Sequence, residues 1–240
     1  MAGNGSLYTG EFYDLVKERL SEDGLAVQWL PFHLLSEAEL KMTVRTFMQV
    51  FPNTTLWLSP LKYHGLLVGT RKPLQIDVQS VRRKLQIPGV RQGLAYAGAV
   101  EPLDFLAAFV MGDDDLRKYV AGARLNTDDH PYLEFSPSWS YFLAQRYALQ
   151  NLNAFQMARK SVAPYLVNTG DTPNAVAAFA DSVARRYDAT QHSFSGDILF
   201  SIGRKDKAWQ EWAAALSIDP GDRSATRSIE RATGVPERRQ

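Results

Sequence analysis

The sequence predicts an α/β region over residues 1–137 and an all-α region over residues 138–240. Three observations lead to this division. Residues 6–30 contain an amphipathic helix, a tight turn and a short apolar strand. A second helix and two strand candidates then follow before residue 75. Beyond residue 138 the chain is rich in alanine, has helical periodicity and contains no convincing strand. The first region therefore looks like one half of a doubly wound sheet.

The first helix and strand organise the predicted sheet. Thr9 can cap a helix whose apolar face carries residues three and four apart, namely Phe12, Leu15, Val16 and Leu20. Residues 25–30 are almost all apolar, the pattern of a strand covered on both faces. Gln28 is the polar exception. It lies near the carboxyl end of the strand, where open α/β sheets bind their ligands.

A second helix and a strand pair complete this region. Ser36 and Glu39 have the spacing of a capping box, which predicts a helix over residues 37–51. Its expected inward residues are Leu40, Val44, Phe47, Met48 and Phe51. Residues 54–58 and 63–69 are strand candidates joined by a turn at Pro60. They should pair antiparallel, because the link between them is too short for a parallel crossover.

The middle of the chain predicts three helices, over residues 78–85, 102–110 and 116–120, with the first ended by Pro88-Gly89. The run from Asn126 to Phe135 includes Asp128, Asp129, His130 and Glu134, which could be metal ligands. Adjacent residues cannot easily converge on one ion, so the pattern favours a turn in which Asn126 and Asp128 bond to backbone N–H groups. His33 and His64 show no carboxylate or nucleophile partner in the sequence, which favours structural roles over general-base catalysis.

The C-terminal region predicts five helices, over residues 139–149, 152–163, 174–187, 193–202 and 205–218. The last two match the spacing of a tetratricopeptide repeat. The repeat's small, small, aromatic, small and proline positions are filled by Gly196, Ala208, Trp212, Ala215 and Pro220. In such a repeat the small residues let two antiparallel helices touch, and the aromatic residue fills the gap to the next pair. Only one repeat is recognisable.

Composition excludes several classes of function. The 240 residues carry a formal net charge of +1, so nothing indicates a nucleic-acid partner or an anionic membrane surface. The chain has no cysteine, which excludes disulfides and thiolate chemistry. No apolar stretch reaches the roughly 18 residues of a membrane span, and no signal peptide is recognisable. We expect a cytoplasmic protein without a cofactor, a metal site or an identifiable catalytic residue of its own.

The segment LYT-x-EFY at residues 7–13, the acidic-Gly turn and the strand containing Gln28 resemble the spermidine synthase family of polyamine aminopropyltransferases. The likeness is to a divergent bacterial branch and covers about residues 2–135. The Asn-Thr-Asp-Asp-x-Pro-x-Leu-Glu-Phe run at residues 126–135 is its second motif. The resemblance implies a methyltransferase-like Rossmann sheet and aminopropyl transfer from decarboxylated S-adenosylmethionine to putrescine or a similar amine. It also implies that Gln28 and Tyr63 bind the polyamine substrate.

One part of that family pattern is missing from the sequence. A donor-binding unit needs a strand that runs into a Gly-rich turn, with an acidic residue about 20 positions later. Neither this element nor the family's aspartate-bearing loop occurs here. We therefore expect a truncated or deliberately shortened chain that is inactive alone. A half-sheet also exposes an edge, which predicts a homo-oligomer or a partner-dependent fold. The alternative is a tetratricopeptide-type interaction module, with a protein partner on the helical tail and a non-catalytic α/β scaffold.

Overall fold

The computed structural model describes residues 5–59, 64–96, 99–136 and 143–234. The protein is a mixed α/β chain that divides into two units, each built from two separate stretches of sequence. Unit 1 comprises Met1–Leu74 and Phe109–Lys160, and unit 2 comprises Gln75–Ala108 and Ser161–Gln240. This division differs from the boundary expected after residue 137. Residues 75–108 belong with the C-terminal helices, and residues 143–160 belong with the sheet.

Unit 1 is the sheet-containing unit, and most of its predicted elements are present. In chain order its elements are the 3-10 helix η1 (Gly5–Tyr8), α1 (Gly10–Arg19), β1 (Leu25–Pro31), α2 (Glu37–Val50), β2 (Asn53–Leu58), β3 (His64–Thr70), β5 (Phe109–Met111), α6 (Asp113–Tyr119) and α7 (Ala144–Ala158). Thr9 caps α1 by accepting the Phe12 N–H, as predicted. Ser36 and Glu39 form the predicted capping box of α2.

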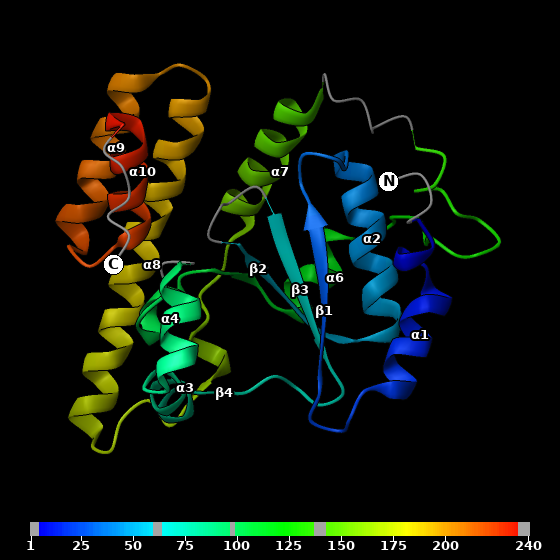
Figure 1. The fold of residues 1–240 in the computed structure, drawn as a ribbon, viewed down its shortest axis with the longest axis horizontal. Coiled ribbons are helices and arrows are strands. Elements are labelled where there is room, and N and C mark those ends of the chain that lie inside the picture. Colours follow the sequence, from blue (N-terminus) through cyan, green and yellow to red (C-terminus); the bar gives the residue numbers. More distant parts are fainter. Residues whose placement is uncertain (1–4, 60–63, 97–98, 137–142, 235–240) are drawn as a thin grey trace. The chain divides into compact units, whose positions relative to one another are not determined.

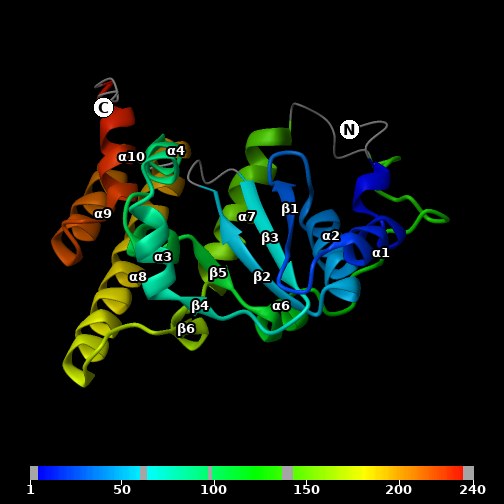
Figure 2. The same ribbon diagram turned by 60° about the horizontal axis from the view of Figure 1, so that its bottom comes forward.

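The sheet of unit 1 has the strand order β1-β3-β2-β5, and every neighbouring pair is antiparallel (Figures 1 and 2). The predicted antiparallel pairing of β2 with β3 is confirmed. Because β3 lies antiparallel to both of its neighbours, β1 and β2 run parallel to each other. Helix α2 connects them, so β1, α2 and β2 form a strand–helix–strand unit with β3 inserted between the two strands.

One face of the sheet packs tightly against helices. The predicted inward residues of α2 are all buried. Gly69 of β3 lies so close to α2 that a β-carbon added to it would come within 2.7 Å of the Phe47 ring. Asn151 of α7 donates its amide to the carbonyls of Phe32 and Leu35, which ties α7 to the loop after β1. The apolar core of unit 1 therefore lies between this face and the helices α2 and α7.

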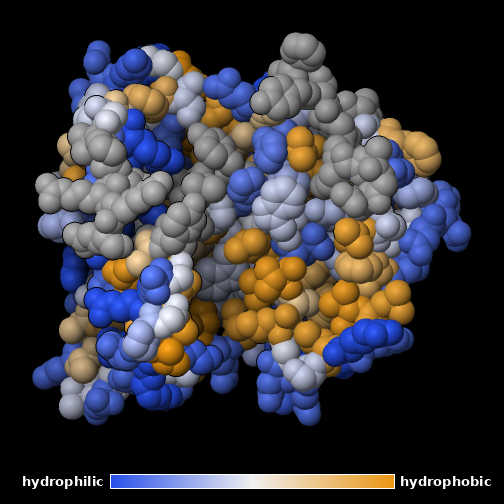
Figure 3. Space-filling view, viewed as in Figure 1, coloured by the Kyte–Doolittle hydropathy of each residue, from blue (hydrophilic) through white to orange (hydrophobic). Residues whose placement is uncertain are grey.

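The other face of β1 is exposed, so the expectation of a strand covered on both faces is wrong. Leu25, Val27 and Trp29 point to this face, and 57%, 58% and 42% of their surfaces are exposed. Leu15 of α1, expected to face inward, is 55% exposed, and Tyr13 takes the buried position of that helix. Figure 3 shows the resulting apolar surface over β1 and α1. Sequence periodicity identified the apolar residues, but their burial depends on which elements pack against them.

One predicted helix became, in part, a strand. The segment expected to form a helix over residues 102–110 ends as a helix at Leu106 and continues as strand β5, which pairs with β2. Pairing in the sheet overrides the local helical preference of this apolar segment. The helix predicted over residues 78–85 is present and ends before Pro88, and Pro88 then begins a further helix. Proline is tolerated in the first turn of a helix, where its missing N–H has no partner to lose.

Unit 2 is mainly helical and contains one short parallel strand pair, β4 with β6 (Figure 2). Its helices include α8, a continuous helix of 29 residues where the sequence predicted two separate ones. The elements in chain order are β4 (Ile76–Asp77), α3 (Val78–Leu85), α4 (Pro88–Tyr96), α5 (Pro102–Leu106), the 3-10 helix η4 (Ala163–Tyr165), β6 (Leu166–Val167), α8 (Pro173–Ser201), α9 (Lys205–Ile218) and α10 (Arg223–Thr233).

Close packing of α8 on α9 follows the small residues found in the sequence. A β-carbon at Gly196 of α8 would overlap the Trp212 ring of α9, so only glycine fits there. Ala208 and Ala215 are fully buried, and Trp212 is 1% exposed. The Trp212 indole N–H donates to Asp197 at 3.1 Å. These contacts bring α9 against the C-terminal part of α8 (Figure 1).

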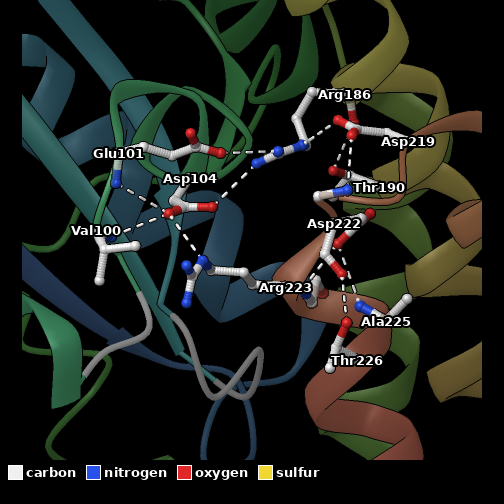
Figure 4. A network of polar contacts seen from close by, with 12 residues as sticks. Val100, Glu101, Asp104, Arg186, Thr190, Asp219, Asp222, Arg223, Ala225 and Thr226 are labelled. Atoms are coloured by element: carbon white, nitrogen blue, oxygen red, sulfur yellow. Dashed lines mark hydrogen bonds and ion pairs between the residues drawn. The ribbon is translucent and has the colours of Figure 1, made fainter.

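A buried ion network joins the two stretches of unit 2 (Figure 4). The Arg186 side chain of α8 is 4% exposed and contacts Glu101 at 3.0 Å, Asp104 at 3.0 Å and Asp219 at 2.5 Å. Burial opposes the charge of Arg186, but Asp219 and the other carboxylates more than offset it and raise the guanidinium pKa. Burial raises the pKa of Asp104, and the backbone N–H groups of Val100 and Glu101 oppose that rise. One arginine thus holds α5 to α8 and to the α9–α10 turn.

Candidate functional site

The predicted substrate-binding residue Gln28 lies in β1, opposite Leu67 of β3. Its side chain is half-buried, and its amide Nε2 donates to the carbonyl of Trp29 at 3.1 Å. Gln28 also hydrogen-bonds the Tyr8 hydroxyl; burial raises the pKa of that hydroxyl, and the Gln28 bond partly opposes the rise. A substrate role for this residue stays a prediction. The second predicted residue, Tyr63, lies outside the described residues.

The Trp29 carbonyl marks the open edge of the sheet. Ser59 N–H donates to His64 O, so the even-numbered residues of β3 bond to β2 and the odd-numbered ones bond to β1. By the register, residues 26, 28 and 30 of β1 bond to β3, and residues 25, 27 and 29 turn their backbone groups outward. The Trp29 carbonyl accepts both Gln28 Nε2 at 3.1 Å and the Tyr8 hydroxyl at 3.4 Å. These side chains cap part of an otherwise unpaired strand edge.

A cluster of rings sits at the carboxyl end of β1, the position at which α/β sheets bind ligands. Strand pairing places Pro31 opposite His64. The Trp29 and His64 rings are 5.1 Å apart, and the His33 and His64 rings are 5.4 Å apart in an edge-to-face arrangement. Burial, together with the neighbouring His33, lowers the pKa of His64 from 6.5. His64 is therefore neutral at pH 7 and can accept a hydrogen bond.

The sequence analysis interpreted His33 and His64 as residues without a functional partner and did not predict that their rings are close. They are 31 positions apart, and only the register of β1 with β3 brings them together. The one available signal was that His33 follows one predicted strand and His64 lies near the start of another. Together the indole and imidazole rings offer aromatic faces and nitrogen acceptors. Such groups can bind an ammonium ion through cation–π contacts and hydrogen bonds.

The Asn126–Phe135 motif forms a tie between separate parts of unit 1. Asn126 is fully buried, and its Oδ1 accepts the Leu133 N–H, so its predicted bond to the backbone is confirmed. Its Nδ2 donates to Tyr8 O. At the turn, Thr127 Oγ1 accepts the His130 N–H. The sequence had predicted that the Asp128 side chain would accept a backbone N–H here. Asp128 instead donates its own N–H to Glu11 Oε2 at 3.0 Å.

Within the described residues, no group of three or more histidine, aspartate or glutamate side chains is placed to hold a metal ion. In the same ranges, no helix combines the length and apolar character needed to cross a lipid bilayer.

Comparison with protein-family models, with curated proteins and with solved structures gives no match for this chain. The site must therefore be interpreted from its own residues and geometry.

Proposed function

We propose that unit 1 is the carboxyl-terminal half of a spermidine synthase-like aminopropyltransferase domain. The observation that carries this proposal is the strand order. Two parallel strands, β1 and β2, are joined by α2, and β3 returns antiparallel between them. Doubly wound sheets are built from such strand–helix–strand units. Gln28 lies toward the carboxyl end of β1, on the side that the resemblance assigns to the polyamine.

In the proposed reaction, an amine nitrogen bonds to the carbon next to the sulfonium of decarboxylated S-adenosylmethionine. The carbon–sulfur bond breaks toward sulfur, methylthioadenosine leaves, and the new ammonium loses a proton. Catalysis of this kind depends mainly on positioning the two reactants. Gln28 would orient the amine at the open edge of β1, whereas the Trp29 and His64 rings lie on the opposite face of that strand. The sequence lacks a Gly-rich donor-binding turn, so the chain alone should not catalyse transfer.

The exposed face of β1 fits this proposal. A half-sheet leaves uncovered the face and edge that the other half would pack against. We therefore expect the protein to self-associate or to depend on a partner. Light scattering during size-exclusion chromatography measures this directly. Association should weaken when Val27 is changed to Thr, and a stable monomer over the whole accessible concentration range would contradict the expectation.

A reconstitution assay tests the catalytic proposal. The full chain is mixed with a polypeptide that carries the Gly-rich donor-binding half of a spermidine synthase-like domain, and methylthioadenosine release is followed with putrescine present. Neither component should turn over alone, and the mixture should. Gln28→Ala should slow the mixture, and Gln92→Ala, an exposed glutamine of α4, should not. A mixture that stays inactive, or activity of the chain alone, would contradict the proposal.

The helical unit supports a second candidate function, a tetratricopeptide-type protein-interaction module. The supporting observation is the packing of Gly196, Ala208 and Ala215 around Trp212, which follows the spacing of that repeat. Trp209 and Ile202 are 37% and 56% exposed near this contact. If this function is primary, a captured partner should be lost with Trp209→Ala and kept with Gln28→Ala. The opposite pattern would favour a partner of unit 1.

A further inference from the structure

Unit 1 contains a cavity away from the ring cluster of β1. Its volume is about 830 Å³, within the range of small-molecule sites. The first half of α2 forms one wall, the loop after α6 forms a second, and the end of the Asn126–Phe135 motif forms a third. Most of the lining is apolar: Ala38, Met42, Ala121, Ala123 and Pro131 contribute to it. The proposed aminopropyl transfer does not use this cavity.

The walls of the cavity are held in place by hydrogen bonds. Asn126, fully buried, accepts the Leu133 N–H and donates its own N–H to Thr46 Oγ1 of α2 at 2.9 Å. Arg45 of α2 donates to Ala123 O, which fixes the loop after α6. Gly122 has φ +75°, and a β-carbon there would meet nothing within 4 Å, so this side of the cavity stays open. The site is therefore formed before any ligand arrives, which reduces the entropy lost on binding.

Aromatic surface is concentrated at the third wall. The His130 and Tyr132 rings stack with centroids 6.1 Å apart and planes 25° apart. Phe135 is 81% exposed and Tyr132 is 41% exposed. The Arg124 guanidinium lies over the Tyr132 ring, with Cζ 5.3 Å from the centroid. A planar ring entering the cavity can stack on this surface, and the guanidinium remains free to form planar hydrogen bonds at its edge.

The charges around the cavity leave one cation without an acidic partner. Lys41 Nζ is 2.7 Å from Glu37 Oε1. The Glu39 carboxylate accepts the Ser36 N–H and hydroxyl at 2.8 and 2.6 Å and also the Ser136 hydroxyl. Arg124, by contrast, has no carboxylate partner among the described residues. Two charges at the cavity therefore lack an ionic partner: the Glu39 carboxylate, which neutral donors already hydrogen-bond, and the Arg124 guanidinium, which lies next to aromatic rings.

We propose that this cavity binds a planar aromatic anion, a ring that carries a phosphate or a carboxylate. The ring stacks on Tyr132 and His130, and the anionic group pairs with Arg124 through charge-assisted hydrogen bonds. The apolar wall from α2 covers the opposite side of the ring. Tight binding requires both the ring and the anionic group of the ligand, because the aromatic wall and Arg124 each contact only one of them.

Titration calorimetry of the full chain tests this proposal. AMP supplies a ring with a phosphate, and indole-3-acetate supplies a ring with a carboxylate. At least one of them should bind with one-to-one stoichiometry, and the tighter one identifies the anionic group. Adenosine and ribose 5-phosphate, which each lack one feature of AMP, should bind about tenfold more weakly or worse if the phosphate compound is preferred. If the carboxylate is preferred, 3-methylindole and acetate take the place of these two probes.

Matched variants complete the test. Arg124→Gln and Tyr132→Leu should each weaken binding by about tenfold, since each removes one contact to the ligand. Arg146→Gln changes an exposed arginine of α7 outside the cavity and should leave the affinity unchanged. The proposal is overturned if neither aromatic anion binds at millimolar concentration, or if the uncharged ring binds as tightly as the charged one. It is also overturned if Arg124→Gln binds like the unaltered chain, or if Arg146→Gln loses as much affinity.

Discussion

The two units differ in how they accommodate charged and apolar side chains. Unit 2 buries a charged group, Arg186, but surrounds it with Glu101, Asp104 and Asp219 from the same unit. Unit 1 also buries an arginine, Arg159, whose Nε donates to the Phe109 carbonyl at 3.1 Å. It leaves apolar side chains of β1 exposed, with Leu25 and Val27 both more than half accessible. Unit 2 therefore pairs its buried charge with carboxylates of its own, and unit 1 carries an exposed apolar strand face.

This difference has a consequence for function. A self-contained helical unit can act as a scaffold or a docking module by its own fold. An exposed apolar face and an open strand edge are features that mark interaction surfaces. The proposed dependence of unit 1 on a donor-binding half follows from this contrast. The predictions below test whether the contrast is real.

The largest effect is expected at the ion network. Arg186→Met removes the cation, so that Asp219 loses its guanidinium partner and Asp104 keeps only the Arg223 guanidinium, with Nε 3.6 Å away. Breaking a buried pair in this way costs about 3–5 kcal/mol of unfolding free energy. Arg185→Met, the exposed neighbour on the same helix, should change stability by about 0.5 kcal/mol or less. Urea unfolding measures both, and equal losses would show that the network is not what stabilises unit 2.

A pair of leucine variants on β1 tests the asymmetry of that strand. Leu30 is fully buried and Leu25 is 57% exposed, so the same change should have different results. Leu30→Ala should cost about 2–5 kcal/mol, because it leaves a cavity against the core. Leu25→Ala should cost about 0.5 kcal/mol. A large loss at Leu25 would mean that its face is covered in solution.

A smaller effect is expected where α8 touches α9. Gly196→Ala places a methyl group against the Trp212 ring and should cost about 1–3 kcal/mol by overpacking. Gly93→Ala makes the same change within α4, where a β-carbon meets nothing within 4 Å. That variant should be stabilised by up to about 1 kcal/mol. Thermal unfolding compares them, and a neutral Gly196→Ala would show that the helices can separate without loss.

The smallest effect is the titration of His64 in unit 1. Its pKa lies below 6.5 because of burial and the neighbouring His33, so the folded state favours the neutral ring. This contribution to stability is fully present above pH 6.5 and is lost as the pH falls through the lowered pKa. His33→Asn should raise the His64 pKa, as measured by NMR of the ring protons. An unchanged pKa would show that the two rings do not interact in solution.

Local signals in the sequence predicted many element boundaries well. Thr9 and Ser36 begin helices where their side chains can accept N–H groups, and α3 covers the predicted residues 78–85. These elements depend on capping and periodicity, which involve only neighbours in sequence. The reading failed where distant partners decide the outcome. Residues 109–111 become a strand because β2 is available to pair with them, and no local pattern carries that information.

The candidate sites also differ in whether the sequence alone could identify them. Gln28 was identifiable because it is the polar residue of an apolar strand. The ring cluster was not, because the contact of His64 with His33 depends on strand register. The cavity beside Arg124 combines α2 with two later segments, so its residues share no motif. Asn151 falls between two predicted helices, over residues 139–149 and 152–163. In the structure it lies within the single helix α7, and its side-chain amide donates to the Phe32 and Leu35 carbonyls.

The most direct test of the central claim is a titration of 5′-methylthioadenosine into two samples. One contains the full chain alone, and the other contains the chain together with a Gly-rich donor-binding half of a spermidine synthase-like domain. We expect no heat of binding from the first sample and saturable binding in the second, tighter than to the donor-binding half alone. Binding of the nucleoside by the chain alone, or no gain when the two halves are combined, would contradict the account.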